Sequence, residues 1–311
     1  MRRLRPLLDE LRDRAFTRAE AAAAGVGDGR LRGPGVVRPF RGIYRDATPR
    51  DLLERCEALA PRLAASDAFS HSTALGLWGA PLADDGRGPV HVTRSGSSSR
   101  ITGAGISGHR STLPLPTELV LGLRVVAPAV AWRQAAEQLS LDDLIAAGDA
   151  IMSERITASG RTPPRTDVAG LRRALDAAPG ARGTANAWLA VPWIREGVHS
   201  RAETRLRLVL VRDGLPEPVT QHPVDVGGGV LHPDLAWPEL RIGLEYEGDE
   251  HRLDRARWRA DITRRERFEA AGWRVIRVHH EHLGSPSARA EFLTRVRVIR
   301  WTREVELGLG R

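Results

Sequence analysis

Three carboxylates lie in a short stretch that is otherwise patterned like two buried strands. They are Asp234, Glu245 and Glu247, in the run LHPDLAWPELRIGLEYEGDEH at residues 231–251. Acidic side chains are poor strand formers and are rarely buried without a partner. Carboxylates that converge repel one another, and a hard divalent cation relieves this repulsion because it prefers oxygen ligands. The stretch therefore predicts a site for Mg²⁺ or Mn²⁺, where a phosphodiester can be polarised and a water activated for attack.

The alternation of side chains along a strand decides whether these carboxylates can meet. Glu245 and Glu247 share one face of the second strand. Directly opposed residues of a hairpin project to the same face, so Asp234 joins them only if paired positions sum to an odd number. This requires an even loop, either Pro238–Glu239 or the four residues Pro238 to Arg241. The alternative is structural: the three carboxylates form salt bridges with the abundant arginines on a solvated face.

Other residues near this stretch are candidates for the same chemistry. Glu203 lies on a preceding helix, but Ser200-x-x-Glu203 is also a capping box, which alone would explain it. His251 could transfer a proton or touch a phosphate, or could simply be exposed. Arg264 and Arg265, on the helix that follows, could face phosphates. The expected catalytic set is Asp234, Glu245, Glu247, Glu203 and His251.

The elements that position these residues follow the order αβββαβ. A helix at SRAETRLRLVLVRDG precedes strands at VTQHPVDV, VLHPDLAW and RIGLEYEG; a helix closed by Gly272 and a strand at WRVIRVH follow. This order, with HPDLAW and EYE, resembles the PD-(D/E)xK nucleases of the restriction-endonuclease-like superfamily, particularly the very-short-patch-repair endonucleases. The resemblance implies that Asp234 and Glu245 ligate the metal and that Glu203 lies near it. Glu247 stands where the motif has lysine, which leaves its role open, with metal ligation as one option.

The N-terminal 45 residues are strongly basic and read as helix, short capped helix, short helix and hairpin. Thr17 with Glu20 forms a capping-box pattern at the second helix. This is the order of a winged helix, and the arginines expected to face DNA are Arg30, Arg32, Arg38 and Arg41. The alternative is a small protein-interaction domain with a solvated basic face.

The segments FTRAEAAAAGV through RGIYR, FSHSTALGLWG and VHVTR carry a second resemblance. They resemble actinobacterial proteins related to the type IV toxin–antitoxin antitoxins of the abortive-infection type. The resemblance implies an N-terminal winged helix ahead of a second α/β domain. It also implies a toxin or defence-system protein as a candidate partner.

Composition limits the classes of function. The chain has 311 residues, a formal net charge of +8 and a pI near 11.0, which favours a polyanionic partner such as DNA. All 47 basic residues are arginine, so no lysine is available for catalysis. Cys56 is the single cysteine, which excludes a disulfide framework. The N-terminus lacks the apolar core of a signal peptide, and the apolar run at 119–132 is too short for a membrane span, so we expect a cytoplasmic protein with no membrane partner.

Four segments follow from these patterns, in an α/β (α+β) fold. We expect a winged-helix-like domain at 1–50, an antitoxin-like α/β domain at 51–155, a linker with one helix at 156–195, and an endonuclease-like domain at 196–300. The expected function is a metal-dependent DNA endonuclease with an N-terminal recognition module. One alternative is a non-catalytic DNA-binding regulator or antitoxin-like protein with a degenerate nuclease fold; another is an enzyme acting on RNA.

Overall fold

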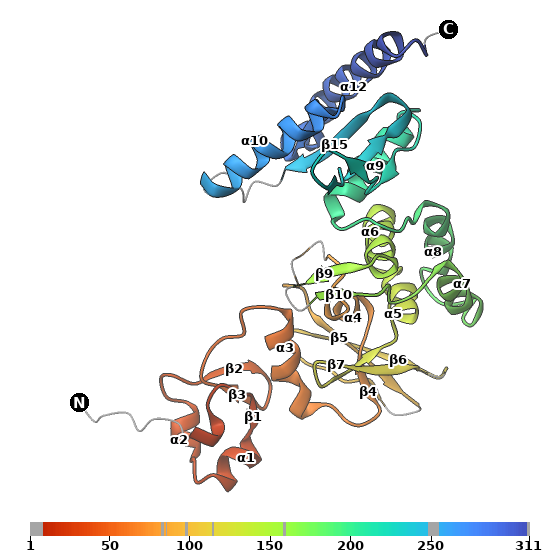
Figure 1. The fold of residues 1–311 in the computed structure, drawn as a ribbon. Coiled ribbons are helices and arrows are strands. Elements are labelled where there is room, and N and C mark those ends of the chain that lie inside the picture. The colour runs from red at the N-terminus through yellow and green to blue at the C-terminus, as the bar shows by residue number, and fades with distance from the viewer. Residues whose placement is uncertain are drawn as a thin grey trace. The chain divides into compact units, whose positions relative to one another are not determined.

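The chain forms two compact units. The computed structural model describes residues 9–81, 84, 86–96, 99–113, 115–157, 160–247 and 255–309 (Figure 1). Unit 1 comprises Met1–Met152 and Pro163–Ile194, and unit 2 comprises Ser153–Thr162 and Arg195–Arg311. Helices and sheets are mixed in both units, which confirms the predicted α/β class at the level of secondary structure.

Unit 1 begins with a small three-stranded sheet and short helices. In chain order these are η1 (Asp9–Leu11), β1 (Phe16–Thr17), α1 (Arg18–Ala23), α2 (Asp28–Leu31), β2 (Val37–Phe40) and β3 (Ile43–Arg45). The strands are antiparallel in the order β1-β3-β2. Thr17 Oγ1 accepts the Glu20 N–H at 3.2 Å, and the Glu20 carboxylate accepts the Thr17 N–H at 2.7 Å. The predicted capping box and hairpin are therefore confirmed, whereas the first predicted helix falls mostly outside the described residues.

The larger part of unit 1 is a five-stranded mixed sheet with helices. Its elements are α3 (Leu52–Leu59), η2 (Ala60–Arg62), β4 (Asp67–Phe69), α4 (His71–Leu77), β5 (Val90–Ser95), β6 (Ile106–Ser111), β7 (Thr117–Val120), β8 (Leu123–Val126), α5 (Pro128–Ala135) and α6 (Leu141–Met152). The strand order is β6-β5-β4-β8-β7, with β5 parallel to β6 and β4 parallel to β8. Helices α4 and α5 pack against each other.

The segment predicted to be a linker with one helix is folded, and that prediction is wrong. It contains β9 (Arg155–Thr157), β10 (Gly160–Thr162), α7 (Val168–Asp176), α8 (Thr184–Ala190) and η3 (Val191–Trp193). Helix α7 packs against α5 and buries Leu171 and Leu175 completely. Alanine and glycine between the helices resemble linker composition, but Gly183 approaches the backbone of Ala136 and Glu137 closely. The hairpin β9–β10 belongs to unit 2.

Among its described residues, unit 2 contains a four-stranded sheet and three helices of 12 residues or more. Its remaining elements are α9 (Arg201–Arg212), β11 (Val219–Thr220), β12 (Val224–Asp225), β13 (Val230–Leu231), β14 (Leu235–Trp237), η4 (Pro238–Leu240), β15 (Ile242–Glu247), α10 (Arg255–Ala270), β16 (Arg274–His279), α11 (His280–Gly284) and α12 (Pro286–Glu306). The order is β11-β14-β15-β16, and β15 runs parallel to β16 through the crossover that contains α10. The predicted αβββαβ order is present in this sheet, with β12–β13 as a separate ribbon.

The turn between β14 and β15 confirms the predicted even loop. Leu235 pairs with Leu244 and Trp237 with Ile242, so paired positions sum to an odd number. The loop is the longer of the two alternatives, Pro238 to Arg241, and Arg241 closes it in the left-handed region at φ 49°. Leu235, Trp237 and Leu244 are fully buried against α9 and α12. Because side chains alternate along a strand, Asp234 and Glu245 lie on the opposite face of the hairpin. Among the residues whose structure is described, no helix combines the length and apolarity needed to cross a membrane.

Candidate functional site

The hairpin places Asp234 beside Glu245. Asp234 immediately precedes β14, and the β14–β15 register, continued by one residue, sets it opposite Glu245. The backbone N–H of Tyr246 donates to Asp234 Oδ2 at 2.7 Å, which holds the carboxylate across the two strands. Asp234 and Glu245 are thus brought together as the parity of the strands requires.

Glu203 joins them from the first turn of α9. Its side chain is buried, and Ser200 Oγ accepts the Glu203 N–H at 3.1 Å as the predicted cap. The Glu203 carboxylate accepts the N–H of His199, at 3.0 Å. Glu203 also acts on Asp234, because its charge raises the pKa of the Asp234 carboxyl. Glu203 therefore takes part in the N-terminal cap of α9 and also acts electrostatically on Asp234.

The pKa of Asp234 reflects its burial and the neighbouring carboxylates. Burial, together with the negative charges of Glu203 and Glu245, raises the pKa of Asp234 to about 7. The Tyr246 N–H and the Arg264 guanidinium act in the opposite direction. Near neutral pH Asp234 is consequently partly protonated, and a divalent cation bound by the same oxygens would displace that proton.

Two of the carboxylates, Glu245 and Glu247, form ion pairs with arginines. Arg264 Nε lies 2.7 Å from Glu245 Oε1, and its Nη2 donates to the carbonyl of His232 at 2.6 Å. Arg277 Nε lies 2.8 Å from Glu247 Oε1, and His279 Nδ1 is 3.6 Å from the other oxygen. Glu247 thus contacts side chains of β16. These pairs match the salt-bridge alternative for Glu245 and Glu247.

The remaining predicted residues are dispersed. His251 lies outside the described residues. Arg265 is exposed on α10 with Nε 3.4 Å from Glu269, and Arg30 donates to the carbonyl of Pro34 at 3.0 Å. Arg32, Arg38 and Arg41 are exposed, the first at the end of α2 and the others on the β2–β3 hairpin.

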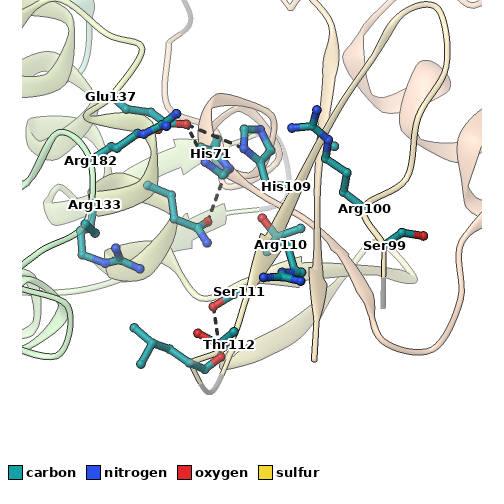
Figure 2. A pocket seen from close by; sticks show the side chains of 15 residues that line it. His71, Ser99, Arg100, His109, Arg110, Ser111, Thr112, Arg133, Glu137 and Arg182 are labelled. Atoms are coloured by element: carbon teal, nitrogen blue, oxygen red, sulfur yellow. Dashed lines mark hydrogen bonds and ion pairs between the residues drawn. The ribbon is translucent and has the colours of Figure 1, made fainter. Parts of the chain in front are cut away.

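Unit 1 contains a pocket that the sequence did not indicate. Its volume is about 690 Å³, and Figure 2 shows His71, His109 and Glu137 at one side of it. The guanidinium-bearing residues that line it are Arg100, Arg110, Arg133 and Arg182. The histidines are widely separated in the sequence, and FSHSTAL and VHVTR showed only a family resemblance. The parallel pairing of β5 and β6 brings His91 and His109 together, and His71 comes from the first turn of α4.

Comparison with known proteins gives relatives without a described activity. No protein-family model matches the chain, and no solved structure matches it significantly. The chain is 29% identical over 250 residues to "Uncharacterized protein Rv2248" of Mycobacterium tuberculosis (strain ATCC 25618 / H37Rv). The same identity and length are found for "Uncharacterized protein MT2308" of strain CDC 1551 / Oshkosh. Each match covers 80% of this chain and 87% of the relative.

Proposed function

We propose that unit 2 is a Mg²⁺-dependent endonuclease domain that hydrolyses phosphodiester bonds in DNA. The observation that carries the proposal is that Asp234 and Glu245 lie opposite each other on the β14–β15 hairpin and that the charge of Glu203, in the first turn of α9, acts on Asp234. Three acidic side chains around a half-buried position repel one another, and that arrangement is stable when a cation or a proton joins them.

The donor set fits a hard divalent cation. All candidate ligand atoms are carboxylate oxygens, the type that Mg²⁺ and Mn²⁺ prefer. Asp234, Glu245 and Glu203 would hold the ion, and Glu247 is a further candidate because it shares a strand face with Glu245. When bound, the ion supplies Lewis acidity toward the phosphodiester and lowers the pKa of a water.

The chain's own residues prepare this site. The Tyr246 N–H orients Asp234, and Arg264 orients Glu245 through its Nε. Asp234 must lose its proton before it can ligate, and burial raises its pKa to about 7. The cleavage rate should therefore rise as the pH increases through about 7.

Recognition of DNA is assigned to the N-terminal part of unit 1. The order β1, α1, α2, β2, β3 with an antiparallel sheet supports a winged-helix-like module. Arg32, Arg38 and Arg41 are exposed there, where guanidinium groups can contact phosphates. Affinity should fall steeply with salt as counterions are released, and Arg38→Gln with Arg41→Gln should reduce that slope by about 2. An unchanged slope after deletion of residues 1–45 would contradict this role.

Cleavage assays test the catalytic proposal. Purified protein is incubated with plasmid, single-stranded DNA and RNA, with Mg²⁺, with Mn²⁺ or with EDTA. Asp234→Asn and Glu245→Gln should abolish metal-dependent cleavage and preserve DNA binding, whereas exposed Glu266→Gln on α10 serves as the matched control. If only RNA is cleaved, the proposed substrate must be RNA rather than DNA. Carboxylate variants that melt at a lower temperature yet cleave at the parent rate would refute the metal site.

The Arg264–Glu245 and Arg277–Glu247 ion pairs favour a second candidate function. Glu247 stands in place of the lysine of the nuclease motif, and a guanidinium already neutralises each of these two carboxylates. Under this alternative the chain is a DNA-binding regulator, or an antitoxin-like protein with a toxin or defence-system partner. It predicts DNA binding without cleavage in any metal, and loss of stability in Glu245→Gln because Arg264 loses its charged partner.

A further inference from the structure

We infer that unit 1 holds a second metal site, for a transition-metal dication such as Zn²⁺, with His71, His91 and His109 as its ligands. This site lies in a different unit from the carboxylates of unit 2 and does not depend on the proposed nuclease function. Imidazole nitrogen suits Zn²⁺, whereas the carboxylate set suits Mg²⁺.

Three elements deliver the histidines to one place. His91 lies on β5 and His109 on β6, and these strands pair in parallel with His91 opposite Ser107 and Thr93 opposite His109. Since side chains alternate along a strand, all four of these residues share one face of the sheet. His71 is the first residue of α4, and its left-handed φ of 54° is an uncommon backbone conformation for a residue other than glycine. Such strain is kept where the surrounding structure and function require it.

The spacing of the ring nitrogens fits a shared ion. One nitrogen from each histidine lies within 4.8 Å of the other two, and His91 Nδ1 is 3.0 Å from His109 Nε2. Zn–N bonds of about 2.0–2.1 Å in tetrahedral geometry place two ligand nitrogens roughly 3.3 Å apart. The imidazole of His71 stacks over that of His109, with ring centroids 3.7 Å apart. Binding of a shared ion requires these stacked rings to rotate so that their in-plane lone pairs converge.

The surroundings supply partners of the kind found behind metal ligands. Glu137 Oε1 lies 3.4 Å from His71 Nε2 and 3.7 Å from His109 Nδ1, contacts drawn as dashed lines in Figure 2. Ser70 Oγ lies 2.9 Å from His71 Nδ1. Carboxylates and hydroxyls beside ligating histidines fix their ring orientation and tautomer. Glu137 also places a negative charge beside the dication.

Burial keeps the rings in the form that binds metal. It lowers the pKa of His71 to about 2 and that of His91 to about 4, and neighbouring histidines act in the same direction. Each ring is therefore neutral near pH 7 and carries one lone pair that can ligate. His71, His109 and Glu137 also line the 690 Å³ pocket, which leaves room for a further ligand, and the four arginines that line it favour an anionic one.

Metal titration of the full-length chain tests this site. The protein is freed of metal with a chelator and titrated with Zn²⁺, with Co²⁺ as a visible-absorption probe. We expect one equivalent of Co²⁺ to bind with ligand-field bands, and Zn²⁺ to raise the melting temperature. His109→Gln and His91→Gln should each weaken binding more than about 100-fold, and Glu137→Gln about 10–100-fold, as outer-sphere partners of metal sites do.

Three control variants separate this cluster from other potential ligands. His222→Gln is a histidine variant in unit 2, His282→Gln changes the HHEH run at 279–282, and Asp234→Asn changes the carboxylate site; all three should bind Zn²⁺ like the parent. Melting curves in chelator show whether each variant is folded, and X-ray absorption on the parent counts its nitrogen ligands directly. The proposal is overturned if the parent binds no more tightly than His109→Gln and His91→Gln. It is also overturned if His282→Gln or Asp234→Asn removes the metal, or if the absorption spectrum shows fewer than three imidazoles.

Discussion

Replacement of Asp234 by asparagine should stabilise the metal-free protein at high pH. Because burial raises the pKa of Asp234 from 3.8 to about 7, the folded chain retains a proton between these pH values that the unfolded chain releases. Folding stability contributed by this group therefore falls as the pH rises from about 4 to about 7 and stays low above that range. Asparagine preserves the shape, accepts the Tyr246 N–H, and carries no charge to bury.

The size of the effect follows from the pKa difference. A change from 3.8 to about 7 corresponds to an upper limit of roughly 4 kcal/mol, at about 1.4 kcal/mol per pKa unit. At about 2–4 °C per kcal/mol for a chain of this size, the melting temperature at pH 8 should increase by up to roughly 8–16 °C. At pH 4 the difference should fall below about 1 kcal/mol, because Asp234 is then protonated in the folded chain and about 40% protonated in the unfolded one.

Melting curves of parent and Asp234→Asn at pH 4 and pH 8 in EDTA measure this difference. Glu266→Gln, an exposed carboxylate on α10, should leave the melting temperature unchanged at both pH values. If Mg²⁺ binds the cluster, adding it should raise the melting temperature of the parent and of Glu266→Gln but not that of Asp234→Asn, and so narrow the difference between parent and Asp234→Asn. An Asp234→Asn protein that melts at or below the parent at pH 8 would refute the reasoning, because the carboxylate would then be stabilised by its partners.

Three further substitutions test packing and ion pairs away from this cluster. Gly183→Ala should cost about 2–4 kcal/mol in urea unfolding, because φ is +78° and a Cβ would lie 2.4 Å from the carbonyl carbon of Ala136 and from the backbone nitrogen of Glu137. Asp67→Asn should destabilise by about 2–4 kcal/mol at pH 7. Burial would raise the pKa of Asp67, but hydrogen bonds from Arg94 at 2.6 and 2.7 Å prevail and lower it, so the difference from the parent should shrink as the pH falls below about 4. Glu217→Gln should cost about 1–3 kcal/mol, because the fully buried Arg207 side chain loses a charged partner at 3.1 Å; equal urea midpoints would contradict this.

Local patterns were sufficient to predict the carboxylate hairpin. The period of two in a strand required an even loop for Asp234 to meet Glu245, and the loop from Pro238 to Arg241 satisfies it. Capping was equally local, since Thr17 and Ser200 each lie three residues before the glutamate whose N–H they accept. These features depend on residues that are close in the sequence or joined by one turn.

Features that depend on distant pairing were not predictable in the same way. The histidine cluster needs β5 and β6 to pair in parallel although residues 96–105 separate them in the sequence. The segment at 156–195 was predicted to be a linker because residues 157–187 are rich in glycine, proline, alanine and threonine. Their burial against α5 comes from Leu171 and Leu175, whose spacing predicted a helix but not its partner.

The interrupted course of unit 2 has a consequence for synthesis on the ribosome. The hairpin β9–β10 is made before α7 and α8, yet the rest of its unit begins only at Arg195. Ser153 Oγ accepts the N–H of Val198 at 3.1 Å, so even this first contact waits for the chain beyond unit 1. At about 5–20 residues per second, the four-stranded sheet is complete on the order of ten seconds after the hairpin, and a lone two-stranded hairpin is marginally stable. Unit 1 should therefore fold during translation while the β9–β10 hairpin still lacks the rest of unit 2. Unit 2 should fold last.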